Sequence, residues 1–335
     1  MSLNVLWFIV IAVLFAGFFL LEGFDFGVGM LIPFLGKNDS ERRTIMNAIG
    51  PFWDGNEVWL ITAAGAMFAA FPNWYATLLS GFYIPLFLLL AALIVRGAGF
   101  EFRSKRDSQR WRSSWDWAIC ISSALPGFLW GVTIANWFEG LPIDAHMNYV
   151  GTLWHLFNPD AILTGLVFTA MFLLHGAVFL SLKTDGKLLE RALTMARRLW
   201  VPTVILAGVF VVSTAVSTGL YHHTAVGLVS LLAAIALLLV GWFVVQRRSG
   251  WAFAMSALTI LTATLTICLG LFPNVMISSL NPAWSLNIYN AASNPYALTV
   301  ISWIALTIIP FVIAYQAWNY WIFRRRVSSH HLGHY

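Results

Sequence analysis

The sequence predicts an all-α protein that crosses a membrane about nine times. Only 10% of its 335 residues are charged, whereas a soluble domain averages about 25%. Apolar stretches long enough to span a bilayer, which takes roughly 20 residues, recur along the whole chain. The lysines and arginines are confined to every second connection between these stretches. A chain this poor in charge cannot cover a water-facing surface, so we expect lipid to be its solvent.

Nine apolar stretches have the length of a spanning helix. No segment between them is long enough for a soluble domain, so we predict one membrane domain, 1–335. The stretch around Glu22 in the first helix resembles the stretch around His175 in the fifth, which indicates an internal repeat. We therefore expect two four-helix bundles, 1–138 and 158–272, followed by a peripheral ninth helix. The predicted helices are 4–33, 51–71, 74–95, 115–138, 158–182, 199–218, 224–246, 251–272 and 299–323.

The basic residues predict the orientation of the chain. Of the 19 lysines and arginines, three follow the first helix, six follow the third, five the fifth, two the seventh and three the ninth. Arg96 is counted at the end of the third helix. Because basic loops stay in the cytoplasm, we expect the N-terminus outside and the C-terminus in the cytoplasm. This placement accounts for the net charge of +5, so no nucleic-acid partner is expected.

Four carboxylates fall within the predicted helices. Glu22 and Asp25 lie on the first helix, and Asp54 and Glu57 lie on the second. The i, i+3 spacing puts each pair on one helix face. An ionised carboxylate at mid-membrane costs roughly 2.5–3.5 kcal/mol on insertion scales, and such residues commonly mark proton pathways. At 1.5 Å per residue all four lie in the cytoplasmic half, so we predict a proton pathway that opens to the cytoplasm. We expect no basic residue within the helices to neutralise them.

Structural roles for the same acids stay open. Asp54 and Glu57 stand in the first turns of their helix, where the helix dipole favours acids. Glu22 and Asp25 could satisfy hydrogen bonds to a partner protein.

Two further acids, Asp116 and Asp160, are expected to be helix caps because they stand where helices are predicted to begin.

His175 is the single histidine predicted to lie deep within a helix, at a depth similar to that of the acids. It is an accessory candidate for the proton pathway, although a lone buried histidine is more often a hydrogen-bonded core residue. The other histidines fall in loops, at helix ends or in the tail, and CxxC and CxxCH are absent. We therefore expect neither a metal site nor a self-sufficient haem site in this chain.

Two long runs resemble signatures of subunit II of the cytochrome bd-type quinol oxidases. The first reads GFDFGVGML at 23–31, and the second reads WDGNEVWLIT at 53–62. Shorter matches cover the rest of the chain: GFY at 81–83, GFEFR at 99–103, WDW at 115–117, NP at 158–159, FP at 272–273 and NP at 281–282.

The resemblance implies a multi-pass subunit of a respiratory enzyme in a prokaryotic cell membrane. Members of this family pair with a homologous subunit I, which carries two b-type haems, haem d and the quinol site. The complex oxidises quinol and reduces dioxygen to water with protons from the cytoplasm. Asp25 and Asp54 match the family positions that line the proton route. Glu22, Glu57 and His175 are accessory candidates. Glutamine also occurs in the family at the position of Glu57, and other members can carry an amide at the position of His175.

The resemblance further implies a supporting role for the haem-bearing subunit, with membrane lipid around both chains. A small single-helix subunit and a structural quinone or lipid are additional expected partners, and the residues that would bind a cofactor here are unknown. Two other functions fit the residues alone. One is a stand-alone proton-coupled membrane transporter whose acids bind substrate or a coupling ion. The other is a purely structural partner.

Overall fold

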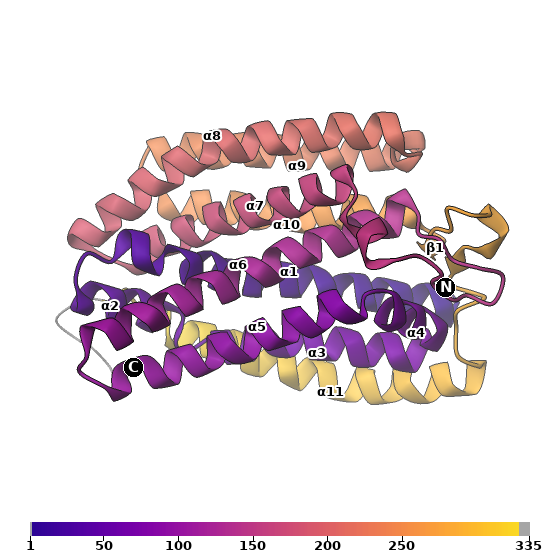
Figure 1. Cartoon of the computed structure of the whole chain (residues 1–335), viewed down its shortest axis with the longest axis horizontal. Helices are drawn as coiled ribbons and strands as arrows, with labels where there is room; N and C mark the ends of the chain where they lie inside the picture. The colour runs from indigo at the N-terminus through magenta and orange to yellow at the C-terminus, as the bar shows by residue number, and fades with distance from the viewer. Residues whose placement is uncertain (1, 328–335) are drawn as a thin grey trace.

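The computed structural model describes residues 2–327, except for the side chain of His222, and consists of long helices that run alongside one another (Figure 1). Eight helices in this part of the chain are long and apolar enough to cross a membrane. These helices are α1 (Leu3–Leu35), α5 (Tyr83–Phe102), α6 (Gln109–Glu139), α7 (Pro159–Lys183), α8 (Gly186–Ser217), α9 (Thr224–Val245), α10 (Ser249–Leu271) and α11 (Pro295–Ile322).

Helix α1 is the centre of the structure. It packs against α6, α7, α10 and α3 (Trp53–Ala70), and its side chains at Phe18, Phe24, Val28 and Ile32 are fully buried. Figure 1 shows the helices stacked in pairs, from α8 and α9 at the top through α7 with α10 and α6 with α1 to α5 with α3, with α11 at the bottom. Helix α11 is the most exposed long helix, because only Leu298 in it is buried.

Shorter elements connect the long helices. Two are α-helices, and the rest are single 3₁₀ turns and a two-stranded antiparallel sheet. They are α2 (Asp39–Ile49), α4 (Pro72–Gly81), η1 (Arg103–Lys105), η2 (Leu153–Phe157), η3 (Leu220–His222), β1 (Asn274–Met276), η4 (Pro282–Trp284) and β2 (Leu286–Asn287).

The third predicted helix, 74–95, is wrong in its placement. The structure divides this stretch into α4 and α5, and the break lies at Phe82, whose φ of −101° and ψ of 23° are not helical. The spanning helix is α5, which continues to Phe102. Arg96, which was expected at a helix end, therefore lies inside a membrane helix.

The second predicted helix corresponds to α3, which runs along the bundle beside α5 and α11 (Figure 1). It has 18 residues but is not among the eight helices apolar enough to span a membrane by composition. Its first turns contain Asp54, Asn56 and Glu57, and these polar side chains lower its hydropathy. The polar first turns of this helix, which packs beside α1, are suited to a functional site, whereas its later turns are apolar.

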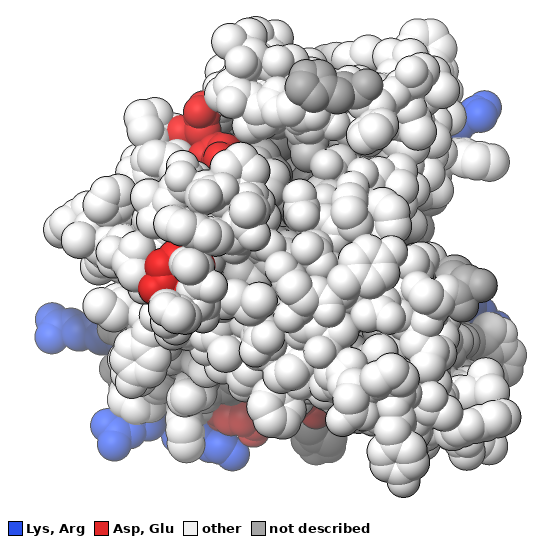
Figure 2. All heavy atoms as spheres, turned by 90° about the vertical axis from the view of Figure 1, so that its right-hand side faces the viewer, with Lys and Arg blue, Asp and Glu red and all other residues white. Residues whose placement is uncertain are grey.

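The connections that hold basic residues share one end of the bundle. In Figure 1 this is the left-hand end, with α2, the α5–α6 turn and the C-terminal end of α11. Figure 2 looks onto the opposite end, where acidic side chains are visible on the surface and lysines and arginines are seen only at the margins. The charge asymmetry read from the sequence is thus an asymmetry between two ends of the molecule.

Helices α1 and α7 touch backbone to backbone at Gly27 and Gly176. A methyl group at Gly27 would collide with the carbonyl oxygen of Phe172 and would lie 2.8 Å from the Cα of Gly176. Only glycine permits this approach, because any side chain would separate the two helices. By contrast, a methyl group at Gly208 on α8 would meet nothing within 4 Å.

We expect Gly27→Ala and Gly208→Ala to have opposite effects on stability. Overpacking a close contact costs about 1–3 kcal/mol, so Gly27→Ala should lower the unfolding temperature and the yield. Gly208→Ala should be neutral or stabilising, because alanine is favoured over glycine in a helix by about 0.8–1 kcal/mol. Thermal unfolding of the detergent-solubilised protein measures both, and equal stability of the two variants would contradict the close contact.

Candidate functional site

Arg96 forms a charged centre between three helices. Its guanidinium on α5 makes an ion pair with Glu22 of α1 and approaches Glu57 of α3, with Nη2 and Oε1 2.6 Å apart. The Arg96 and Glu22 side chains are fully buried, and Glu57 is 20% exposed. The ring of Phe26 lies beneath the guanidinium, with 4.7 Å from Cζ to the ring centroid. One cation therefore joins α1, α3 and α5.

This centre corrects the expectation that no basic residue lies within the helices. Removing charges from water is costly, and a buried cation is tolerated only when anions and hydrogen bonds replace its hydration. Arg96 has Glu22 and Glu57 as counter-ions. Its Nε and Nη1 groups nevertheless have no hydrogen-bond acceptor among the described residues. Such unsatisfied buried atoms are uncommon and mark places with a functional or water-binding role.

Asp25 lies beside this centre in a chain of hydrogen bonds. Its carboxyl group is fully buried, and its Oδ2 accepts a hydrogen bond of 2.7 Å from Nδ2 of Asn56 on α3. The Oδ1 of Asn56 accepts hydrogen bonds from Nε2 of Gln316 at 3.1 Å and from the hydroxyl of Tyr320 at 2.8 Å. Both donors come from α11, so the C-terminal helix completes the surroundings of an acid near the N-terminus of the chain.

Asp54 is not part of the buried group. It lies in the first turn of α3 on the exposed face of that helix, which continues through Val58, Ile61 and Phe68 at 46%, 70% and 60% exposure. The four predicted acids therefore divide into a buried set of Glu22, Asp25 and Glu57 around Arg96 and one exposed carboxylate nearer the basic end of the bundle.

His175 is buried on α7 and fully hydrogen-bonded. Its Nδ1 lies 2.7 Å from the hydroxyl of Ser256, and its Nε2 lies 3.1 Å from the carbonyl oxygen of Leu20. The ring stacks on Phe253 at 4.9 Å between centroids and an interplanar angle of 10°. These contacts hold the ring in place, and the partners of His175 do not include the carboxylates around Arg96.

The expectation that Asp116 and Asp160 are caps is wrong. Helix α6 is capped by Ser108, and Asp116 lies two turns inside it, fully buried. Its two oxygens accept from Arg42 at 2.7 Å and from Nε of Arg103 at 2.5 Å, which joins α2 to the α5–α6 turn.

Asp160 lies in the first turn of α7, but Asn158 is the cap and accepts from the backbone N–H of Ala161. The hydroxyl of Ser213 on α8 donates to the carboxylate of Asp160.

Glu41 extends the ion pairing at the basic end to α8, through its contact with Arg191. Partial burial acts to raise the pKa of this carboxyl group. The hydrogen bonds from Arg191 and from the backbone N–H of Lys37 outweigh burial and hold the pKa of Glu41 below its ordinary value. Glu41 therefore stays ionised, and α2 is fixed to α6 and α8 by charge.

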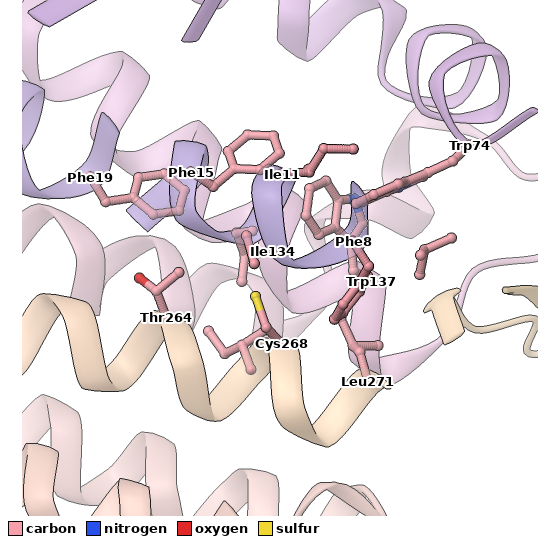
Figure 3. A pocket seen from close by; sticks show the side chains of 13 residues that line it. Phe8, Ile11, Phe15, Phe19, Trp74, Ile134, Trp137, Thr264, Cys268 and Leu271 are labelled. Atoms are coloured by element: carbon pink, nitrogen blue, oxygen red, sulfur yellow. The ribbon is translucent and has the colours of Figure 1, made fainter. Parts of the chain in front are cut away.

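Two of the cavities in the described part of the structure differ in size. The first has a volume of about 30 Å³, and side chains of α1, α4, α6 and α10 converge on it, among them Phe15, Trp137 and Cys268 (Figure 3). This volume is close to that of one water molecule and is too small for a cofactor. The second cavity lies between α7, α8, α9 and α10 and has a volume of about 350 Å³. Its walls are mostly apolar, with the hydroxyls of Thr203 and Tyr221 among the polar groups.

His175 offers no free nitrogen as an axial ligand for haem. Axial ligation needs an unoccupied nitrogen or sulfur atom, and both ring nitrogens of His175 are engaged. Among the described residues, no group of three or more histidines, cysteines and acids could hold a metal ion. The tail residues His330, His331 and His334 lie outside the described part of the chain.

Reasoning from the sequence missed four residues of the site: Arg96, Asn56, Gln316 and Tyr320. The break at Phe82 concealed Arg96, because one continuous helix from 74 ends before it. Gln316 and Tyr320 did carry a signal. Their i, i+4 spacing puts two polar groups on one face of an apolar helix, which is costly unless that face meets another polar group.

Comparisons with known proteins agree with the motifs. The family model for cytochrome bd terminal oxidase subunit II matches residues 3–323. The cytochrome bd ubiquinol oxidase subunit 2 of Bacillus subtilis is 46% identical over 329 residues, which cover 98% of this chain and 97% of that relative. The cytochrome bd-I ubiquinol oxidase subunit 2 of Escherichia coli K12 is 36% identical over 362 residues, which cover 98% and 96%.

A solved structure of bd oxidase from Geobacillus thermodenitrificans contains a chain with the same fold. The TM-score is 0.77 at 18% sequence identity, and the match covers 96% of this chain and 99% of that chain.

We expect Arg96→Met to destabilise the protein by about 3–5 kcal/mol, because it leaves buried carboxylates without their counter-ion. Adding Glu22→Gln and Glu57→Gln should recover much of the loss, since both carboxylates that pair with Arg96 become neutral. Arg247→Met is the matched control, because it removes an exposed ion pair with Glu190 worth about 0–1 kcal/mol. Thermal unfolding of the four proteins measures these differences. An Arg96→Met protein as stable as the control would contradict the role of Arg96 as counter-ion.

Proposed function

The chain belongs to the cytochrome bd terminal oxidase subunit II family, and from this premise we propose how its buried charges serve the oxidase. It is a multi-pass protein of the bacterial cytoplasmic membrane and a subunit of a quinol:oxygen oxidoreductase of the respiratory chain. The complex uses haems and contains a second oxidase subunit, subunit I. The comparisons do not favour the alternative of a stand-alone transporter.

We propose that α3 is a ninth spanning helix, with the N-terminus outside and the C-terminus in the cytoplasm. Two features support this topology. Helix α3 runs between the same two ends of the bundle as its neighbours (Figure 1), and the basic connections all lie at the end that we assign to the cytoplasm. The division into 1–138, 158–272 and a ninth helix at 299–323 belongs to the same proposal.

We further propose that this subunit carries protons from the cytoplasm toward the site of oxygen reduction in subunit I. The observation that carries the proposal is the convergence of Glu22, Asp25 and Glu57 around Arg96, with Asp54 nearer the cytoplasmic end on an exposed face. Asp54 takes a proton from cytoplasmic water, and the buried acids pass it inward. The positive charge of Arg96 lowers the free-energy cost of burying three neighbouring carboxylates.

Asp54 also indicates which face subunit I covers. A carboxylate on an otherwise apolar exposed helix face is costly against lipid. A partner that covers Asp54, Val58, Ile61 and Phe68 would provide polar groups or water for the carboxylate and apolar groups for the rest. We place the contact with subunit I on this face of α3.

Drawing these protons from the cytoplasm stores energy. A charge that crosses the whole membrane field is worth about 2.3 kcal/mol per 100 mV. When quinol releases its protons outside and oxygen reduction consumes protons from inside, the oxidase charges the membrane without a separate pump. His175, which is fully hydrogen-bonded, is given no more than an accessory part in this pathway.

We assign the two b-type haems, haem d and the quinol site to subunit I. The engaged nitrogens of His175 support this assignment. The cavity of about 350 Å³ between α7 and α10 is our candidate for a structural quinone or lipid tail, since ligand pockets typically have about 300–1,000 Å³ and mostly apolar walls. A small single-helix subunit completes the proposed assembly.

We expect Asp25→Asn and Asp54→Asn to lower oxygen consumption by the assembled complex by about tenfold or more, because positioned proton donors and acceptors typically contribute 10²–10⁴-fold to rates. Glu190→Gln is the control, since it removes an exposed acid that pairs with Arg247 outside the proposed pathway. Oxygen uptake with a short-chain quinol measures all three. Undiminished uptake by the two aspartate variants, with unchanged haem spectra, would exclude the pathway.

We expect the isolated chain to be colourless and the complex to be coloured. The reason is that both ring nitrogens of His175, the histidine buried among the described helices, are engaged, whereas subunit I is proposed to provide all the axial ligands. A visible spectrum is recorded after purification through a tag on this chain, with and without co-expressed subunit I. Haem bands of full stoichiometry in the preparation without subunit I would refute the assignment.

A further inference from the structure

Asn56 stands between Asp25 and helix α11, and its hydrogen bonds define the direction of its amide group. Two donors, Nε2 of Gln316 and the hydroxyl of Tyr320, point at Oδ1 of Asn56. The same oxygen cannot also face Asp25, so the NH₂ group is turned to the carboxylate and donates at 2.7 Å. A hydrogen bond donated to an ionised group is stronger than one between neutral groups. This arrangement therefore favours Asp25 in its ionised form, ready to accept a proton.

A protonated Asp25 would require the opposite arrangement. Its O–H group would have to donate to Asn56, and the amide would have to turn so that Oδ1 faces the carboxyl group. The NH₂ group would then face α11, where Tyr320 and Gln316 would have to become acceptors. The turn would require both residues to reorient, and it would also remove the hydrogen bond of 3.4 Å from Nδ2 of Asn56 to the carbonyl oxygen of Leu21. The energy of the protonated state therefore depends in part on α11.

Helix α11 is held where it makes these contacts. Tyr320 stacks on Phe52 at 4.5 Å between centroids, and the amide of Asn319 donates to the carbonyl oxygen of Pro51 at 3.0 Å. Lys183 of α7 donates to the carbonyl oxygens of Phe323 and Arg325 beyond the end of the helix. The rest of α11 is mostly exposed. The N-terminal end of α11 is held separately, because Nε1 of Trp7 donates to the hydroxyl of Ser302, so contacts at both ends fix the helix beside α1 and α3.

We propose that Gln316 and Tyr320 are positioning residues that hold the Asn56 amide as a donor to Asp25 and so determine how readily Asp25 takes up a proton. This inference rests on the proposed proton pathway and deepens it. The other ionisable groups around Asp25 are Glu22 on its own helix, Glu57 on α3 and Arg96 on α5. His175 of α7 contacts α1 at the carbonyl oxygen of Leu20, five residues before Asp25.

The test is the infrared spectrum of the intact oxidase as a function of pH. Asp25→Asn identifies the Asp25 band by its loss. Tyr320→Phe and Gln316→Leu each remove one donor to Asn56 and should increase the protonated fraction of Asp25 at neutral pH. The pH at which the Asp25 band reaches half of its full intensity should rise by about one unit. The reason is that a hydrogen bond to an ionised group favours the ionised form over the protonated form by roughly tenfold. The pH profile of oxygen consumption should shift with it.

Thr307→Val is the matched control on the same helix, because its hydroxyl donates only to the carbonyl of Trp303, and it should leave the band unchanged. In an Asn56→Leu background, Tyr320→Phe should produce no additional shift. Haem spectra check assembly, and Gln316→Leu carries the test if Tyr320→Phe does not assemble.

An unchanged Asp25 band in both donor variants would overturn the positioning role. A shifted band together with undiminished oxygen uptake by Asp25→Asn would support the positioning role and reject the proton pathway, so the two failures are distinguishable.

Discussion

The low dielectric of the membrane interior is the constraint on which the rest of the structure depends. In such a medium each buried charge must be balanced by a partner within reach. Arg96 satisfies this condition for Glu22 and Glu57, and in doing so it fixes the relative positions of α1, α3 and α5. The glycine contact between α1 and α7 then links this charged centre to the second half of the chain. Charge and close packing thus act on the same central helix.

Part of this site follows from the sequence, because depth in a membrane can be counted in residues. All four acids were expected at similar depths in the cytoplasmic half. The structure brings Glu22, Asp25 and Glu57 together around Arg96 and leaves Asp54 on an exposed helix face. Arg96 was missed because the length of an apolar stretch does not show where a helix breaks. Phe82 is apolar, so the non-helical backbone there leaves no mark on hydropathy. The placement of one arginine changes the site from an array of like charges to a group in which a cation offsets part of the charge of three carboxylates.

The hydrogen bonds around Asn56 could not be predicted for a different reason. Gln316 and Tyr320 are separated from Asn56 by about 260 residues, and no local pattern indicates which helix lies beside which. Their shared face on α11 showed only that a polar partner is needed. Asp116 illustrates the same limit, because its position near a predicted helix start suggested a cap, while its arginine partners come from α2 and the α5–α6 turn.

The contacts made by α11 have a consequence for the order in which the site is completed during synthesis. Asp25 and Asn56 enter the membrane with the first part of the chain, but Gln316, Tyr320 and the carbonyl groups bound by Lys183 are translated last. Until then the Asn56 amide lacks its two donors from α11 and is held only by its hydrogen bonds to α1. A ribosome that stops before the final helix therefore leaves a chain that holds its buried acids but lacks the two side chains of α11 that donate to Asn56.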